Sequence, residues 1–187
     1  MNLLILLLTL AAPLGLDWEK TNNRVPVIQE YMYYYGDVYY DPIVYAGTSD
    51  LIGLETELQL YFANKKISKA ILILGPAGLN EQNCIEKLKE YISLMNGKYG
   101  KHSIVKQWTS SLKNDLLFVS PCKLYQNGLK RTQYFWKLKK FNIDVILLGD
   151  DEGLYIETTY TNKNLLKFQK NKKIKKIYKR ISKEIKK

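Results

Sequence analysis

Mostly apolar runs alternate with amphipathic segments through the middle of the chain. Runs at residues 70–74, 116–119, 143–148 and 154–156 are typical of buried strands, and residues 104–105 form a shorter candidate. Apolar residues also recur at helical spacing over residues 51–64, 85–97 and 129–140. The pattern therefore predicts strands and helices in alternation.

Alternating strands and helices predict an α/β fold. We expect a three-layer, mostly parallel sheet flanked by helices, of the flavodoxin-like or Rossmann-like kind, because helices are the usual connections between parallel strands. The chain of 187 residues divides into an apolar N-terminal segment at 1–17, the α/β domain at 18–160 and a basic helical extension at 161–187. An apolar stripe through Ile174, Tyr178, Ile181 and Ile185 predicts the helix in the extension.

The charge lies almost entirely in the C-terminal extension. The whole chain has 29 Lys and Arg against 18 Asp and Glu, a net charge of +11. Residues 161–187 alone hold twelve Lys and Arg and one acid, Glu184, so the rest of the chain is neutral. Such an arm predicts a polyanionic partner, either nucleic acid or an anionic membrane surface.

The N-terminal segment and the cysteines bear on the compartment. Residues 3–10 have the length of a signal-peptide core and are short for a membrane span, but no basic residue precedes them. A cleaved signal and a packed N-terminal helix are both open. Cys84 and Cys122 are expected to be buried free thiols, since two cysteines make neither a disulfide framework nor a zinc site. The single histidine, His102, excludes histidine-cluster metal catalysis.

Three local patterns suggest chemistry, and each has a simpler explanation. Residues 75–78 follow a strand as a phosphate loop would, but no Lys-Ser/Thr pair follows, so a plain turn is favoured. Asp150 and Asp151 follow a strand, where α/β enzymes place acids, yet a solvated loop is favoured. Residues 128–138 are similar to a recognition helix, but a strand precedes them.

Several short blocks resemble one family when taken in order: Tyr35-Gly36-Asp37 with residues 41–45, then residues 50–56, 70–75, 105–114, 115–119 and 142–150. Their order and spacing over residues 30–160 resemble the small-subunit ribosomal protein S-two of bacteria and organelles. That family has a helical hairpin after the tryptophan block, whereas here Asn114 meets Asp115 directly. Gln107 stands where the family usually has arginine, and Ser110 and Ser111 replace two glycines.

The resemblance implies a divergent mitochondrial member lacking the coiled-coil hairpin. Its expected function is that of a structural constituent of the small subunit of the mitochondrial ribosome, binding small-subunit rRNA and neighbouring ribosomal proteins. It implies no enzyme activity, no cofactor, no metal, no small-molecule substrate and no membrane contact. Two alternatives stay open: a secreted or membrane-associated α/β domain with a polybasic lipid-binding tail, and a small enzyme using residues 75–78 and Asp150.

Under the ribosomal hypothesis, cations neutralise phosphates without reading sequence, while Trp108 packs as the anchor of its turn more readily than it stacks on a base. The candidate RNA-binding residues are Lys101, Lys106, Trp108, Lys113, Lys130 and Arg131 in the domain, with Lys172, Lys173, Lys175, Lys176, Lys179 and Arg180 in the arm.

Overall fold

The computed structural model describes residues 13–22, 24, 26, 28, 31–37, 40–49, 53–109, 119–151 and 153–165, and the structural statements below concern these residues. The strands are β1 (Met32–Asp37), β2 (Tyr40–Ser49), β3 (Leu54–Ala63), β4 (Lys66–Leu79), β5 (Ile104–Thr109), β6 (Lys130–Lys137), β7 (Phe141–Asp150) and β8 (Gly153–Asn162). The helices are α2 (Cys84–Tyr99) and α3 (Pro121–Gln126), and η1 (Pro13–Gly15) is a short 3-10 turn.

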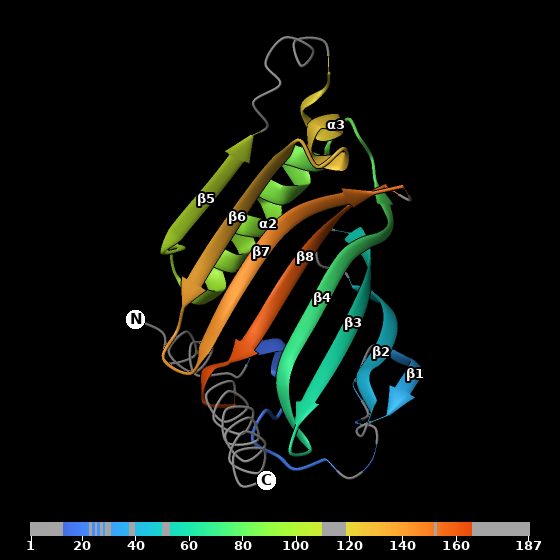
Figure 1. Ribbon diagram of the computed structural model, residues 1–187, viewed down its shortest axis with the longest axis vertical. Helices are drawn as coiled ribbons and strands as arrows, with labels where there is room; N and C mark the ends of the chain where they lie inside the picture. Colours follow the sequence, from blue (N-terminus) through green and yellow to red (C-terminus); the bar gives the residue numbers. More distant parts are fainter. Residues whose placement is uncertain are drawn as a thin grey trace, which may run out of the picture.

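The strands form one sheet in the order β1-β2-β3-β4-β8-β7-β6-β5 (Figure 1). All seven pairings between neighbours are antiparallel. The predicted mostly parallel, three-layer α/β fold is therefore wrong. The sheet consists of two four-stranded meanders, β1 to β4 and β5 to β8, joined through β4 and β8. The segment containing α2 carries the chain from β4 to the far edge at β5.

The connections between strands explain why the sheet is antiparallel. Asn64 and Lys65 join β3 to β4, and their φ angles of 52° and 62° suit a two-residue type I′ turn. Residues 138–140 join β6 to β7, and residues 151–152 join β7 to β8. Parallel neighbours need a crossover of roughly a dozen residues or more, which none of these three connections provides.

Two of the predicted helices are strands. Residues 51–64 contain β3, where Leu58, Leu60 and Phe62 are buried at every second position. Residues 129–140 contain β6, where Thr132 and Trp136 face the core. Both segments also carry apolar residues at helical spacing, and pairing with neighbouring strands decides against the helix.

The other predicted elements are largely confirmed. Residues 70–74, 143–148 and 154–156 lie inside β4, β7 and β8, residues 104–105 begin β5, and the helix predicted over 85–97 is α2. The strand predicted at 116–119 and the helix predicted in the C-terminal extension fall mostly or wholly outside the described residues. The hydrophobic pattern predicts neither β1, β2 nor α3.

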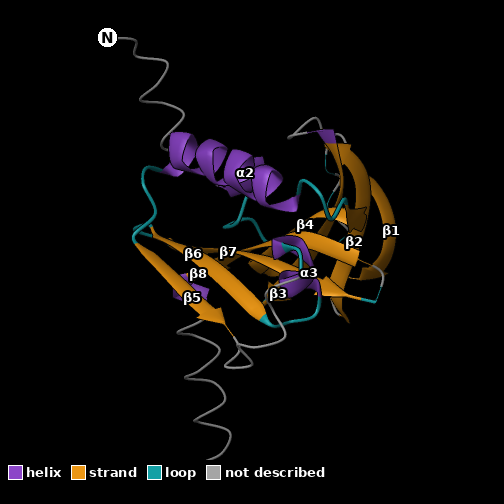
Figure 2. Cartoon of the chain, turned by 90° about the horizontal axis from the view of Figure 1, so that it is seen from above, coloured by secondary structure: helices purple, strands orange, loops and turns teal. Residues whose placement is uncertain are grey.

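Helix α2 covers one face of the sheet (Figure 2). Leu72 and Val145 are among the buried residues on the central strands. At the centre of β8, the Thr158 hydroxyl donates a hydrogen bond of 2.9 Å to the Tyr91 hydroxyl, so a buried threonine is satisfied by the helix. The residues that α2 buries are Cys84, Leu88, Tyr91, Ile92 and Met95. We call the opposite side of the sheet the open face.

Cys84 and Cys122 form a disulfide, with their Cα atoms 6.0 Å apart, so the prediction of free thiols is wrong. Cys84 is the first residue of α2, and Cys122 lies in the first turn of α3. The bond therefore fixes α3 beside the start of α2. The two cysteines are 38 residues apart in the chain, a spacing that matches no local motif, so only the fold reveals the pairing.

Packing against β7 holds α3 in place as well. A Cβ at Gly149 would overlap the backbone of Gln126, so glycine is required where the helix crosses the strand. The Tyr125 and Thr132 hydroxyls lie 2.7 Å apart and join α3 to β6. Ser120 caps the helix by accepting the backbone N–H of Lys123 at 3.2 Å.

We expect the disulfide to supply a large part of the stability of the domain. In the chain-entropy model, a cross-link spanning 38 residues restricts the unfolded chain by about 4 kcal/mol. The double variant Cys84→Ser/Cys122→Ser should therefore lose about 2–4 kcal/mol of unfolding free energy in urea titrations. The wild-type protein with a reductant should behave like the variant. Equal stability of oxidised and reduced wild-type protein would contradict the expectation.

Candidate functional site

Three of the predicted RNA-binding side chains come together on the open face, at the β5 edge of the sheet. Trp108 lies opposite Arg131 in the β5–β6 pairing, and Lys106 lies opposite Gln133. With Ile146 of β7 they line a hollow of about 720 Å³. Trp108 is 54% exposed, so it is not the buried packing anchor that the sequence suggested.

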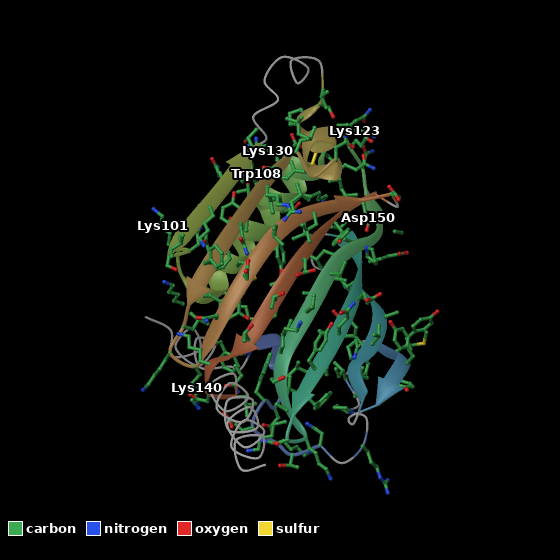
Figure 3. All side chains as sticks on the ribbon, viewed as in Figure 1. Lys101, Trp108, Lys123, Lys130, Lys140 and Asp150 are labelled. Atoms are coloured by element: carbon green, nitrogen blue, oxygen red, sulfur yellow. A yellow bond between two sulfur atoms is a disulfide. The ribbon has the colours of Figure 1, made fainter. Side chains whose placement is uncertain are left out.

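The remaining predicted cations do not join this hollow. Lys130 pairs with Thr109 at the start of β6, and its Nζ lies 5.4 Å from the centre of the Tyr125 ring. Lys101 is exposed in the connection between α2 and β5, away from Trp108 (Figure 3). The other candidates lie outside the described residues: Lys113, Lys172, Lys173, Lys175, Lys176, Lys179 and Arg180.

Two carboxylates, Asp144 and Glu157, lie on the same face. Gln133 Nε2 donates a hydrogen bond of 2.6 Å to Asp144 Oδ2, while Asp144 Oδ1 is buried without a hydrogen-bond partner among the described residues. Burial is the largest effect and raises the pKa of Asp144. The hydrogen bond from Gln133 lowers this pKa, the charge of Glu157 raises it, and Lys106 has the smallest, lowering effect. A polyanion bound beside Lys106 would therefore also meet negative charge, which weakens the case for an RNA track here.

The local patterns that suggested enzyme or DNA-binding chemistry have structural roles. Residues 75–78 lie inside β4, with a shift of pairing between Leu74 and Leu79, so they form no turn before a helix. Residues 130–137 are β6, which rules out a recognition helix there. Asp150 ends β7, and its carboxylate accepts the backbone N–H of Gly153 at 3.2 Å in the hairpin turn.

A second surface lies at the other end of the sheet from Trp108 and Lys130, where Figure 3 shows Lys140. We call it the basic pole, and it consists of residues 13–19, 97–100, 138–141 and Lys163. Its centre is a hollow of about 930 Å³. The exposed lysines Lys98, Lys139 and Lys140 line this hollow. The apolar residues that line it come from three separate segments: Pro13, Leu16, Trp18, Tyr99, Leu138 and Phe141.

The N-terminal residues of the pole belong to the core. Trp18 is 2% exposed, and its ring meets that of Phe141 edge to face at 4.9 Å. Trp18 Nε1 donates a hydrogen bond of 3.0 Å to the Pro13 carbonyl, which closes η1 onto the domain. Leu16 is also buried. The folded body therefore includes residues 13–18.

The basic arm leaves the domain at this pole. The backbone N–H of Lys163 donates to the Lys140 carbonyl at 3.0 Å, and Lys163 Nζ donates to the Leu138 carbonyl at 2.6 Å. These bonds follow from the sheet, because Asn162 at the end of β8 pairs with Phe141 at the start of β7. The root of the arm is thus tied to the loop that lines the hollow.

The acidic residues of the pole already have partners. Asp17 Oδ1 accepts the backbone N–H groups of Glu19 and Lys20, at 3.3 and 3.1 Å. Glu19 Oε2 lies 4.0 Å from Lys66 Nζ. Three lysines and these two carboxylates line the hollow, so its lining has a net charge of +1 before the arm is counted.

Burial also affects Tyr99 in the wall of the hollow. It raises the pKa of the Tyr99 hydroxyl to about 12, and the neighbouring Tyr91 adds to the effect. The hydroxyl therefore stays neutral at physiological pH and contributes no negative charge to the pole.

Compared with known protein families, with curated proteins and with solved structures, the chain matches none of them. Within the described part of the chain, no helix is long and apolar enough to cross a membrane, and no three His, Cys, Asp or Glu side chains gather as a metal site would require. The two surfaces described above are the candidate functional sites.

Sequence reasoning missed the basic pole. It placed Lys139 and Lys140 in a helix, whereas they form the β6–β7 turn. Trp18 and Phe141 are far apart in the chain, so no local pattern joins them. In the sequence, the one indication of a cationic surface is the lysine-rich composition of residues 161–187.

We expect Asp144→Asn to raise stability at neutral pH. The raised pKa means that the folded state favours protonated Asp144, so this group's stabilising contribution is present below its unfolded pKa and is lost as the pH rises through its folded pKa. The unfolding free energy of the variant should therefore exceed that of the wild type at neutral pH, with the difference shrinking under acidic conditions. Urea titrations across this pH range measure it.

Asp151→Asn is the matched control, because it removes the same charge from an exposed position near the end of β7. A gain in stability for Asp151→Asn equal to that of Asp144→Asn would show that net charge, and not burial of Asp144, is responsible.

Proposed function

We propose that this chain is an exported, disulfide-linked β-sheet domain that attaches to anionic membrane surfaces through its basic pole and C-terminal arm. The observation that carries the proposal is the convergence at one end of the molecule. The root of the arm, three exposed lysines, an apolar hollow and the junction with the apolar N-terminal segment all lie there. The chain acts as a binding module, with no catalytic role.

Charge and geometry together favour a surface over a small ligand. Twelve cations in residues 161–187 give roughly 1 kcal/mol each when they lie close to an anionic bilayer. Because the arm starts at the pole, these cations and Lys98, Lys139 and Lys140 can reach the same surface. One flat anionic partner then satisfies both groups of lysines.

The disulfide supports an oxidising compartment. Disulfides persist in secreted and periplasmic proteins and are rare where thiols are kept reduced. The Cys84–Cys122 bond therefore agrees with reading residues 3–10 as a signal-peptide core. The apolar run at residues 3–10 and the Cys84–Cys122 disulfide thus both favour export.

The mitochondrial ribosomal role stays a prediction. The hollow with Lys106, Trp108 and Arg131 is an observation in its favour, since aromatic and basic side chains together can hold RNA. However, the resemblance implies a parallel α/β sheet, and the observed sheet is antiparallel. A disulfide is also unusual for a protein assembled on rRNA in a reducing compartment.

We expect the arm to control binding to anionic vesicles. Replacing Lys172, Lys173, Lys175, Lys176, Lys179 and Arg180 by Gln should weaken binding to phosphatidylglycerol-containing vesicles by about a hundredfold or more, since each cation contributes roughly 1 kcal/mol. Vesicle co-sedimentation measures the affinity, and added salt should weaken wild-type binding because it screens the charges.

A control variant, Lys106→Gln/Lys130→Gln/Arg131→Gln, removes three cations at the other end of the sheet, and it should bind anionic vesicles like the wild type. Equal binding of wild-type protein to phosphatidylcholine vesicles would count against the proposal. Recovery of the chain with small ribosomal subunits, with Cys84 and Cys122 as free thiols, would replace it with the ribosomal role.

We expect export to remove the apolar segment and to leave the core intact. Because Pro13 is buried and its carbonyl accepts the hydrogen bond from buried Trp18, the processed chain should begin no later than Pro13. Intact-mass measurement of protein from an export-competent host gives the start. The variant Ile5→Arg/Leu7→Arg, which breaks the apolar run, should stay unprocessed with reduced cysteines. An intact Met1 in oxidised wild-type protein would contradict signal cleavage.

A further inference from the structure

We propose that the hollow of the basic pole receives one acyl chain of an anionic membrane lipid, with the lipid head group lying against the surrounding lysines. This inference rests on the proposed function, because an anionic bilayer at the pole supplies the lipid. It adds a defined binding site to the electrostatic attraction of the cationic arm.

The walls of the hollow suit a hydrocarbon chain. Leu16 and Trp18 come from the N-terminal segment, Tyr99 from the end of α2, and Leu138 and Phe141 from the β6–β7 connection. Its volume of about 930 Å³ lies within the roughly 300–1,000 Å³ of small-molecule sites. Predominantly apolar walls favour an alkyl chain over a sugar or a nucleotide, whose polar groups would lack partners.

The charges around the hollow select the head group. Lys98 follows Gly97 in the last turn of α2, with its Nζ 5.4 Å from the centre of the Tyr99 ring. Lys139 and Lys140 approach from the β6–β7 turn. Asp17 and Glu19 line the same hollow, but both have partners within the protein. An anionic head group beside an apolar chain matches this arrangement.

The apolar segment at residues 1–12 is the rival occupant. It continues directly from Pro13, which lines the hollow, and its composition suits the same walls. Under the proposed function this segment is removed on export, so the processed protein is the form that should bind lipid.

Gly97 offers a way to obstruct the rim of the hollow without disturbing the core. It lies in α2 and lines the hollow, and a Cβ built there meets no atom within 4 Å. Gly97→Phe therefore places a bulky ring at the rim of the hollow, and Gly97→Ala is the matched control. Both substitutions replace glycine inside a helix, so neither is expected to lower stability by the loss of helix propensity.

The experiment titrates processed protein with monomeric dodecyl phosphate in a calorimeter, with octyl phosphate and the uncharged dodecyl maltoside as comparison ligands. Wild type and Gly97→Ala should bind dodecyl phosphate more tightly than octyl phosphate, by up to about fourfold for each added methylene. Gly97→Phe should bind it at least about tenfold more weakly, at unchanged thermal stability, because its ring occupies space needed by several methylenes.

Equal binding of dodecyl phosphate by Gly97→Phe and Gly97→Ala would overturn the inference. So would binding of dodecyl maltoside as tight as that of dodecyl phosphate, since the lysines would then select nothing. If binding is strong in protein that keeps residues 1–12 and absent from processed protein, the hollow of the processed form does not hold an acyl chain and the inference also fails.

The source of the chain is tested with phosphatidylglycerol vesicles, to which Gly97→Phe should bind more weakly than Gly97→Ala while keeping its salt dependence. Identical vesicle binding would mean that the site takes free amphiphiles and no bilayer lipid, which overturns the proposal as stated. The arm variant separates the two proposals. Loss of vesicle binding by the arm variant supports the proposed function, whatever the result for Gly97→Phe. Binding of dodecyl phosphate tests only whether the hollow takes an acyl chain.

Discussion

Strands β4 and β8 pair in antiparallel register, with Leu72 opposite Thr158 and Leu74 opposite Ile156, and this pairing joins the two halves of the sheet. Without it, β1 to β4 and β5 to β8 would be separate meanders, each with an exposed edge at its inner strand. With it, one buried row runs across the central strands through Leu58, Leu72, Thr158 and Val145. A slip by one residue would turn Leu72 and Leu74 to the open face, so the burial of the core fixes the register.

The same pairing determines where the ends of the domain emerge. Because β7 and β8 are antiparallel neighbours, the end of β8 at Asn162 lies beside the start of β7 at Phe141. Phe141 contacts Trp18, which brings the N-terminal residues to the same place. Helix α2 ends at Tyr99 in the wall of the same hollow. The strand order thus brings the segments of the basic pole together. The arm begins at this pole, beside the N-terminal residues and the end of α2.

How far the sequence predicts this molecule depends on whether the information is local. The local hydrophobic pattern correctly predicts the strands at residues 70–74 and 143–148 and the helix at residues 85–97. Residues 51–64 and 129–140 fit two periods at once, and only pairing with neighbouring strands chooses between them. The Asn64-Lys65 turn is a local hairpin signal that sequence reasoning overlooked. The disulfide and the contact of Trp18 with Phe141 join residues distant in the chain, so no spacing rule finds them.

Charged side chains are distributed differently at the two ends of the sheet. Near Trp108 the cations Lys106 and Arg131 share the open face with Asp144 and Glu157, so that region offers no uniform field to a polyanion. At the pole three lysines outnumber Asp17 and Glu19 around the hollow, and the arm adds its cations at the same end. Under the proposed function, an anionic surface would attract the pole first, and Trp108 lies at the other end of the sheet (Figure 3). The half-exposed Trp108 is therefore not part of the proposed membrane contact.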